Sequence, residues 1–150
     1  MAENSFRERI ILANISLVES LSSITTVVRT IQSYSDLQNY AITQFPIVAV
    51  VGRLPIPTYK HSLRIREDID QVLSTLRIDY YTYFMDNEDS DSQLSILLDD
   101  MWSKLHTNPT RDNICLETTL EMTEESQVYA PYGAFRITSI HQYSHTIRRI

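Results

Sequence analysis

The chain has 150 residues, 43% of them apolar and 21% charged, which are the proportions of an ordinary globular domain. A chain of this length buries enough surface to fold without a disulfide, and its single cysteine, Cys115, excludes an intramolecular one. No apolar run approaches the ~20 residues that span a bilayer, and the first residues do not follow the pattern of a secretory leader. We therefore expect a single domain, residues 1–150, without a membrane partner, made and kept in a reducing cytosol.

The charge of the chain argues against general nucleic-acid binding. Thirteen Lys and Arg stand against nineteen Asp and Glu, a net charge of −6, whereas such binding depends on neutralising phosphates. The imbalance lies in the second half, because residues 1–75 carry seven basic and seven acidic side chains and residues 76–150 carry six and twelve. Such a chain can meet copies of itself through opposite charges, or simply present a solvated acidic surface. The only two glycines, Gly52 and Gly133, exclude a glycine-rich phosphate loop.

Hydrophobic periodicity divides the chain into helices and strands. Ser5 and Glu8 stand at the spacing of a capping box, which predicts the start of an amphipathic helix. Leucines and other apolar residues recur at helical spacing from Leu94 to Leu105, and β-branched and aromatic residues alternate from Asp70 to Phe84. The expected elements are a helix at 5–21, a strand at 25–32, a short helix at 36–42, strands at 45–52 and 70–84, a helix at 94–105, strands at 113–122 and 133–144, and a polar connector at 123–131.

This mixture of helices and strands predicts an α+β fold, in which one mixed sheet of about five strands packs against two main helices. The most apolar segment, residues 45–52, is expected at the centre of the sheet with both faces covered. Leu98, Trp102 and Val50 are expected in the core between the sheet and the helices.

A long, basic loop is expected between the second and third strands, at residues 53–68. Pro55, Pro57 and the lack of clean alternation indicate a loop that extends from the body of the domain. It can bind a phosphate backbone, or become ordered against an acidic surface of a neighbouring copy. The basic candidates are Arg53, Lys60, His61, Arg64 and Arg66. The acidic candidates precede the second main helix and are Asp86, Glu88, Asp89 and Asp91.

No pattern in the sequence points to catalysis, a metal or a cofactor. The acidic run at 86–91 lacks the glycine and the glutamate that an EF-hand loop needs at its sixth and twelfth positions. His141 and His145 would lie about 13 Å apart on a strand, too far for one metal ion, and surface positions are expected for them. Cys115 is expected in a strand beside apolar residues, as an inert thiol. No nucleophile motif is present, and we expect a protein that is not an enzyme.

Tyrosines on the strand at 70–84 raise the question of base stacking. Tyr80, Tyr81 and Tyr83 could stack nucleic-acid bases, as aromatic residues on sheets do. Asp79 and the acidic run flank them, so the basic surroundings that this binding needs are expected to be missing, and no specific nucleic-acid partner is expected.

The order of these segments resembles that of the tail terminator proteins of tailed phages. The similarity lies in the capped helix at 5–21, the strand Phe45-Pro46-Ile47-Val48-Ala49-Val50-Val51, the loop after it, Ile78-Asp79-Tyr80-Tyr81, the helix at 94–105 and Gly133-Ala134-Phe135-Arg136-Ile137-Thr138. It covers nearly the whole chain and rests on layout and short motifs.

The resemblance implies a structural virion protein of the tail or neck, assembled in the host cytoplasm. It would form a hexameric ring on the last ring of the tail tube protein, end tube elongation and present the surface that joins the head-tail connector protein. The long loop would take part in ring contacts, and a head-to-tail ring would suit the uneven charge. The alternatives are another neck or tail-completion protein, or a small ferredoxin-like module that binds nucleic acid or a regulatory ligand, with an unrecognised enzyme behind both.

Overall fold

A computed structural model describes residues 5–29, 37–66, 69–85, 90–111, 115–129 and 132–148. Six strands form one mixed sheet in the order β1-β2-β4-β6-β5, and β3 pairs with β4 beside β2. The elements are α1 (Phe6–Glu19), β1 (Thr26–Val28), the 3-10 helix η1 (Ile42–Gln44), β2 (Ile47–Gly52), β3 (Ile56–Arg66), β4 (Ile69–Met85), α3 (Ser90–His106), β5 (Glu117–Tyr129) and β6 (Tyr132–Arg148). The expected α+β fold, with one mixed sheet and two main helices, is confirmed.

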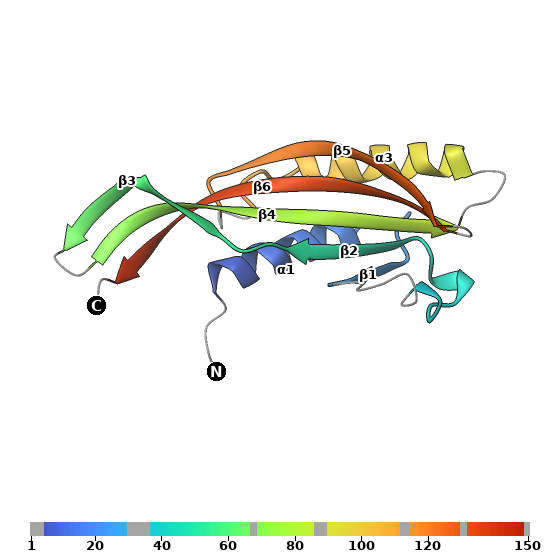
Figure 1. Ribbon diagram of the computed structural model, residues 1–150, viewed down its shortest axis with the longest axis horizontal. Coiled ribbons are helices and arrows are strands. Elements are labelled where there is room, and N and C mark those ends of the chain that lie inside the picture. Colours follow the sequence, from blue (N-terminus) through green and yellow to red (C-terminus); the bar gives the residue numbers. More distant parts are fainter. Residues whose placement is uncertain are drawn as a thin grey trace.

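Both main helices cover the same face of the sheet (Figure 1). α1 starts at the predicted cap, where the Ser5 side chain accepts a hydrogen bond of 3.2 Å from the Glu8 backbone N–H. It packs closely on β2, because a Cβ at Gly52 would lie only 2.4 Å from Ile11 Cδ1. Arg7 Nη2 adds a hydrogen bond of 2.9 Å to the Gly52 carbonyl oxygen. The small residue at the end of β2 therefore permits the close approach of helix and sheet.

α3 turns its predicted apolar stripe toward the sheet. Leu97, Met101 and Leu105 are buried there, and Leu98 and Trp102 are only partly buried at the margin of the same cluster. The expectation of Leu98 and Trp102 inside the core is therefore wrong, whereas Val50 lies in it as predicted. The wider apolar stripe extends past the edge of the contact, so its outermost side chains remain half exposed.

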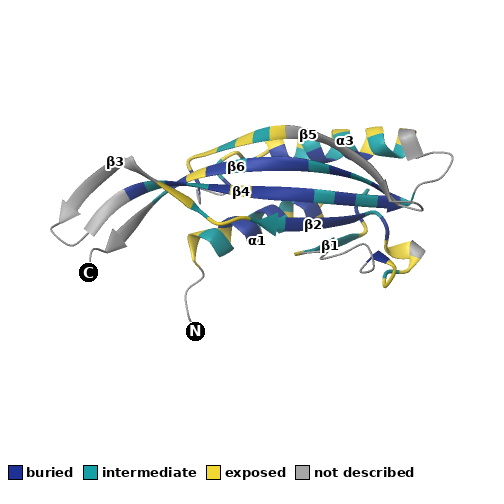
Figure 2. Cartoon of the chain, viewed as in Figure 1, coloured by how far each residue is buried: buried dark blue, intermediate teal, exposed yellow. Residues whose placement is uncertain are grey.

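β4 lies at the centre of the sheet and carries the alternation that the sequence predicts. Its even-numbered residues from Val72 to Phe84 are buried, and most of its odd-numbered residues from Leu73 to Met85 are less so (Figure 2). β2 is correctly predicted as covered on both faces, because Val48 joins the helical core and Ile47 packs with Leu37 and Phe45 on the other face. The central place predicted for this strand is wrong, because β2 lies next to the edge strand β1 and the middle of the sheet is occupied by β4.

The predicted loop at 53–68 is wrong, because most of it is the strand β3. β3 pairs antiparallel with β4 from Ile56 opposite Thr75 to Arg66 opposite Ile69. Proline is tolerated in an edge strand such as β3, where a backbone N–H need not join the ladder. A register shift between Thr58 and Leu63 breaks the alternation that would have marked a strand in the sequence.

The connector predicted at 123–131 is also wrong, because β5 continues to Tyr129. This strand starts at Glu117 rather than at the predicted residue 113. A register shift between Thr123 and Gln127 interrupts the alternation there. β1 is shorter than the strand predicted at 25–32, and residues 30–36, including the proposed cap Asp36, lie outside the described residues.

Candidate interaction surface

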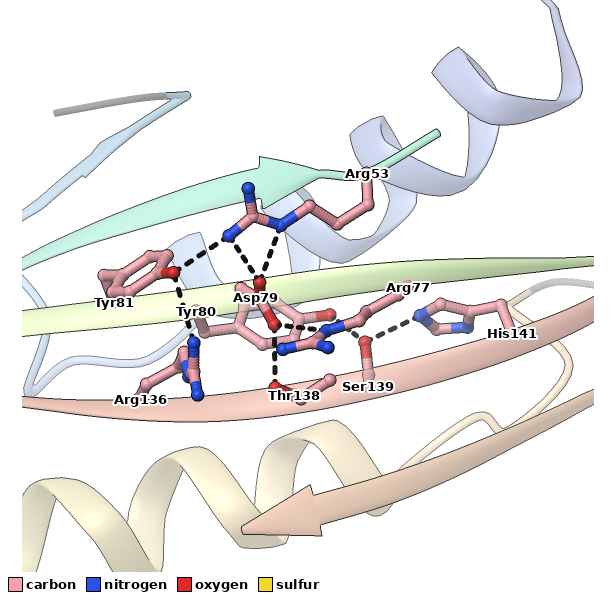
Figure 3. Close-up of polar contacts among 9 residues, drawn as sticks. All are labelled: Arg53, Arg77, Asp79, Tyr80, Tyr81, Arg136, Thr138, Ser139 and His141. Atoms are coloured by element: carbon pink, nitrogen blue, oxygen red, sulfur yellow. Dashed lines mark hydrogen bonds and ion pairs between the residues drawn. The ribbon is translucent and has the colours of Figure 1, made fainter. Parts of the chain in front are cut away.

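Two arginines bind one buried carboxylate, and a third lies beside them, on the face of the sheet that α1 and α3 leave uncovered. In the register of β4 and β6, Asp79 lies opposite Thr138 and Tyr81 lies opposite Arg136. Alternate side chains of a strand share a face, so these four lie together. We call the whole group the arginine cluster, and its members are Arg53, Arg77, Asp79, Tyr81, Arg136 and Thr138 (Figure 3).

Asp79 is the anchor of the arginine cluster, because it is fully buried and accepts three short hydrogen bonds. Arg53 Nε donates to Oδ2 at 2.8 Å, and Arg77 Nε and Thr138 Oγ1 donate to Oδ1 at 3.1 and 2.7 Å. Burial by itself would raise the pKa of Asp79, but the hydrogen bonds from Thr138, Arg53 and Arg77 outweigh it and lower the pKa. The carboxylate therefore stays ionised and holds both guanidinium groups in place.

Tyr81 fixes the outer part of the arginine cluster. Arg53 Nη2 donates a hydrogen bond of 2.9 Å to its hydroxyl, and the Arg136 guanidinium lies 5.8 Å from the centre of its ring. The Arg53 and Arg77 side chains are nevertheless 45% and 47% exposed. The cluster therefore presents three guanidinium groups against one carboxylate, and it holds them in defined positions before any partner arrives.

The structure separates the predicted basic residues from the predicted acidic ones. Arg53 belongs to the arginine cluster, and Asp91 is the second residue of α3. β3 pairs with residues 69–75 at the start of β4, whereas α3 begins beyond the other end of this strand (Figure 1). Lys60, His61, Arg64 and Arg66 all lie on β3, and Asp86, Glu88 and Asp89 lie outside the described residues.

The rest of the arginine cluster was missed at the level of sequence. The alternation on β4 places Arg77, Asp79 and Tyr81 on one face, and this pattern could have indicated a polar patch. The contribution of Arg136 depends on the register between β4 and β6, strands that are far apart in the sequence and whose pairing no local pattern specifies. The expectation that Tyr81 lacks basic neighbours is therefore wrong, while Tyr80 is buried on the opposite face.

A second polar group lies buried under the helices, and we call it the buried network. Asn14 Oδ1 accepts hydrogen bonds from the Tyr80 hydroxyl at 2.7 Å and from Arg111 Nε at 2.9 Å. The other Arg111 nitrogens donate to backbone carbonyl oxygens at the end of α3 and just beyond it. Ser139 Oγ contacts both the Tyr80 hydroxyl and His141 Nε2 at 2.8 Å. These contacts join α1, α3, β4 and β6 into one unit.

His141, Cys115 and Asn14 have the residue types of a cysteine-histidine-asparagine catalytic set, but their geometry does not suit proton transfer. Thr118 Oγ1 donates to the Pro109 carbonyl oxygen at 2.7 Å, so at 2.9 Å it accepts the proton of His141 Nδ1. The Cys115 sulfur, 3.9 Å from that nitrogen, therefore meets a donor and no base. Burial lowers the pKa of His141 to about 3 and raises the pKa of Cys115.

These positions also correct two expectations. His141 is fully buried rather than at the surface, and Cys115 precedes β5 rather than lying inside it, although it is buried as predicted.

Among the residues that the structure describes, no group of three His, Cys, Asp or Glu could hold a metal ion. No described helix is long and apolar enough to cross a membrane. Comparison with known proteins gives no match to a family model and none to a curated protein.

Proposed function

We propose that this chain is a structural assembly protein, a tail terminator of a tailed phage that forms a hexameric ring on the end of the tail tube. In that role it ends tube elongation and presents the surface that joins the head-tail connector protein. The observation that carries the proposal is the arginine cluster, which displays cations held in place by the buried Asp79 carboxylate. Such a surface suits the docking of an acidic protein partner.

The arrangement of elements supports the same role. The segments on which the resemblance to tail terminators rests are α1, β2, β4, α3 and β6, and they form the body of the domain. The segment after β2, expected to take part in ring contacts, is an edge strand in the structure. Edge strands offer backbone groups to neighbouring chains, so this segment remains suited to the role.

The polar groups of the buried network support a non-enzymatic function. The histidine and the thiol there are tied to structural hydrogen bonds and shifted toward their uncharged forms. A general base must be within reach of a substrate proton and able to accept it. His141 meets neither condition, since it is buried, its Nε2 contacts Ser139 and Asn14, and burial lowers its pKa to about 3.

A nucleic-acid-binding module is the second candidate, and one observation favours it. Tyr81 stands on an uncovered sheet face between Arg53 and Arg136, a combination that single-stranded nucleic acids use for stacking and phosphate contacts. The net charge of −6 opposes it. Salt-dependent retention of single-stranded DNA or RNA would favour this candidate over the assembly protein.

The proposal is tested by measuring the mass of the protein with light scattering over a range of concentrations, followed by negative-stain images of the protein alone and on purified tail tubes. We expect rings, and tubes capped at one end. The double variant Arg77→Gln, Arg136→Gln should weaken tube capping at least tenfold, because both changes remove a cation without placing a new carboxylate beside Asp79. Arg9→Gln, which neutralises an exposed arginine on α1, is the matched control.

Two outcomes would overturn the proposal. One is a protein that stays monomeric at high concentration and never associates with tails. The other is equal capping by the native protein, the double variant and the Arg9→Gln control, which would leave the arginine cluster without a docking role.

A further inference from the structure

Two of the edge strands of the sheet, β3 and β5, carry opposite charge. β3 (Ile56–Arg66) contains Lys60, Arg64 and Arg66 with His61 and no acidic residue. β5 (Glu117–Tyr129) contains Glu117, Glu121, Glu124 and Glu125 and no basic residue. Three of the seven basic residues of the first half thus lie on β3, and four of the twelve acidic residues of the second half lie on β5.

Both strands are edges of the sheet. In the part of the chain that the structure describes, β3 pairs with β4 alone and β5 pairs with β6 alone. The outer side of an edge strand presents backbone N–H and C=O groups that can pair with another chain. Glu117 and Glu121 are exposed, and their register with Gln142 and Thr138 places them on the face that carries the arginine cluster.

Each edge also exposes apolar side chains where it begins. Leu54 and Ile56 are 82% and 66% exposed at the start of β3, and Leu116 is 59% exposed just before β5. Ile56 lies opposite Thr75, Thr75 opposite Gln142, and Gln142 opposite Glu117. The apolar residues of the two edges therefore lie at nearly the same level along the strands, on opposite sides of one molecule.

A single sign of charge on each edge disfavours pairing of like edges, since like charges on adjacent strands repel. Opposite signs on the two edges favour pairing of unlike ones. The direction of the strands permits it as well, because β3 runs antiparallel to β4, and β5 runs in the same direction as β4 through its antiparallel partner β6. Adjacent copies that lie in the same orientation and are displaced along the strands would bring β3 and β5 together antiparallel.

We propose that β3 of one copy binds β5 of the next copy, so that the basic strand, which carries Lys60 and Arg66, pairs with the acidic one. The inference rests on the proposed ring and deepens it by naming the two surfaces that meet. The contact joins two different surfaces of the same chain, so it repeats from copy to copy and closes where the rotation permits.

The contact requires neighbouring copies to be staggered along the strands. From the level that Ile56 shares with Glu117, β3 extends toward one end of the sheet and β5 toward the other. In Figure 1, β3 lies with the start of β4 and the end of β6 in an arm beyond both helices. A staggered neighbour places its β5 against this arm, and stagger is the usual geometry when a sheet closes on itself.

This arrangement replaces the acidic run at 86–91 as the partner of the basic segment. Met85, the last described residue before that run, lies opposite Tyr132, at the other end of β4 from the residues that pair with β3. β5 instead supplies four glutamates along one edge strand. The two possible acidic partners, β5 and the run at 86–91, are distinguished by charge reversal. Only the true partner should restore assembly when its charges are reversed together with those of β3.

The first test is a set of charge reversals measured by sedimentation of the assembled ring. Lys60→Glu with Arg66→Glu should weaken assembly at least tenfold, and so should Glu117→Lys with Glu121→Lys. All four changes together should restore assembly to within threefold of the native protein. Arg64 is left unchanged because it lies opposite Asp70 on β4. Circular dichroism and thermal denaturation of each variant monitor the fold.

The matched control reverses Asp89→Lys and Asp91→Lys in the Lys60→Glu, Arg66→Glu background. We expect no rescue there. Rescue by this pair, or absence of rescue by the β5 pair in variants that are folded, would overturn the proposal.

The second test uses the unmodified protein, so it does not depend on variants that fold. The chain has only two lysines, Lys60 and Lys104, and a zero-length carbodiimide joins a lysine to a carboxylate in contact with it. In mixtures of 14N and 15N protein, and on purified tails, mass spectrometry should find Lys60 joined to Glu117, Glu121, Glu124 or Glu125 of a differently labelled copy. Cross-links confined to Lys104, to residues 86–91 or within one copy would overturn the proposal.

The outcomes also separate this inference from the proposed function. Rings with the Lys60 cross-link that never cap tails would retain the contact and overturn the tail terminator role. Capped tails whose cross-links join other surfaces would retain the role and overturn the contact. A monomer in all conditions, with no cross-link on tails, would overturn both.

Discussion

Under the helices, Arg111 is fully buried and donates four hydrogen bonds, whereas on the uncovered face Arg53 and Arg77 share one carboxylate with nearly half of each side chain exposed. Water can replace a lost partner on the open face but not in the buried network. The buried cation of Arg111 therefore contributes mainly to stability, whereas the cations of Arg53 and Arg77 on the uncovered face remain available to a partner.

The largest expected effect comes from Arg111. Arg111→Met keeps much of the volume but leaves Asn14 Oδ1 with one donor and removes the side-chain donors of the Leu105 and Thr107 carbonyl oxygens. The Asn108 carbonyl oxygen keeps the Arg111 backbone N–H as a donor. Each buried acceptor left without its donor typically costs about 1–3 kcal/mol, so the variant should unfold at markedly lower urea concentration or be insoluble. A loss below ~1 kcal/mol in urea titration would show that the buried network does not hold the layers together.

A smaller loss is expected at the anchor of the arginine cluster. Asp79→Asn removes the charge that two guanidinium groups share, but solvent reaches both of them, so we expect a loss of about 1–3 kcal/mol. Glu121→Gln neutralises an exposed carboxylate on the same face and should cost less than ~0.5 kcal/mol. Equal losses in the two variants, measured by urea titration, would contradict the role of Asp79 as an anchor.

The pH dependence of stability should report the buried network. In the folded state the His141 ring takes up its second proton, and with it a positive charge, only below a pKa of about 3, whereas in the unfolded chain it does so below ~6.5. Acidification from ~6.5 toward ~3 therefore favours the unfolded state, by at most about 1.4 kcal/mol per pH unit from this group. His141→Gln should flatten the dependence of the melting temperature on pH in this window, whereas an unchanged slope would assign it to other groups.

Asp79 affects the pH dependence of stability in a lower pH range than His141 does. Its pKa is lowered below the ordinary value, so its stabilisation is complete above ~4 and is lost as the pH falls through the lower, folded value. The His141→Gln variant should therefore keep an acid transition at the low end of the range, and Asp79→Asn should remove part of it.

A smaller effect on stability than at Asp79 is expected at the rim of the arginine cluster. Arg136→Gln should change the free energy of unfolding by less than ~1 kcal/mol, because the side chain is only partly buried. Binding to tail tubes should weaken with added salt in the native protein, and the weakening should be smaller in the variant, since one cation fewer takes part. A salt dependence identical in both proteins, measured by co-sedimentation, would exclude Arg136 from docking.

The elements with a regular local pattern were predictable. Ser5 and Glu8 define the start of α1, and the alternation of β4 separates its buried face from its open one. β3 and the end of β5 were missed because edge strands accept proline, charge and register shifts, which in a sequence are typical of loops. The expectation that residues 53–68 form a loop treated Pro55 and Pro57 as breaks in structure.

The candidate site was only partly predictable, for a different reason. Arg53 was found because basic residues follow it in the sequence. Arg77 and Arg136 reach the same place through the pairing of β4 with β6, and a pairing between distant strands has no local signature. His141 was placed at the surface because nothing near it in the sequence shows that Asn14 and Ser139 would satisfy its ring nitrogen.

The contact between Asn14 and His141 also constrains when the protein can fold. These residues are 127 positions apart, and the nascent chain emerges from the N-terminal side. α1 can therefore complete its polar contacts only after β6 has been synthesised. Until then its apolar stripe cannot pack against the complete sheet. Closing so long a loop is slow, so we expect the chain to acquire protease resistance in one late step, after release of residue 141 from the ribosome, rather than gradually during translation.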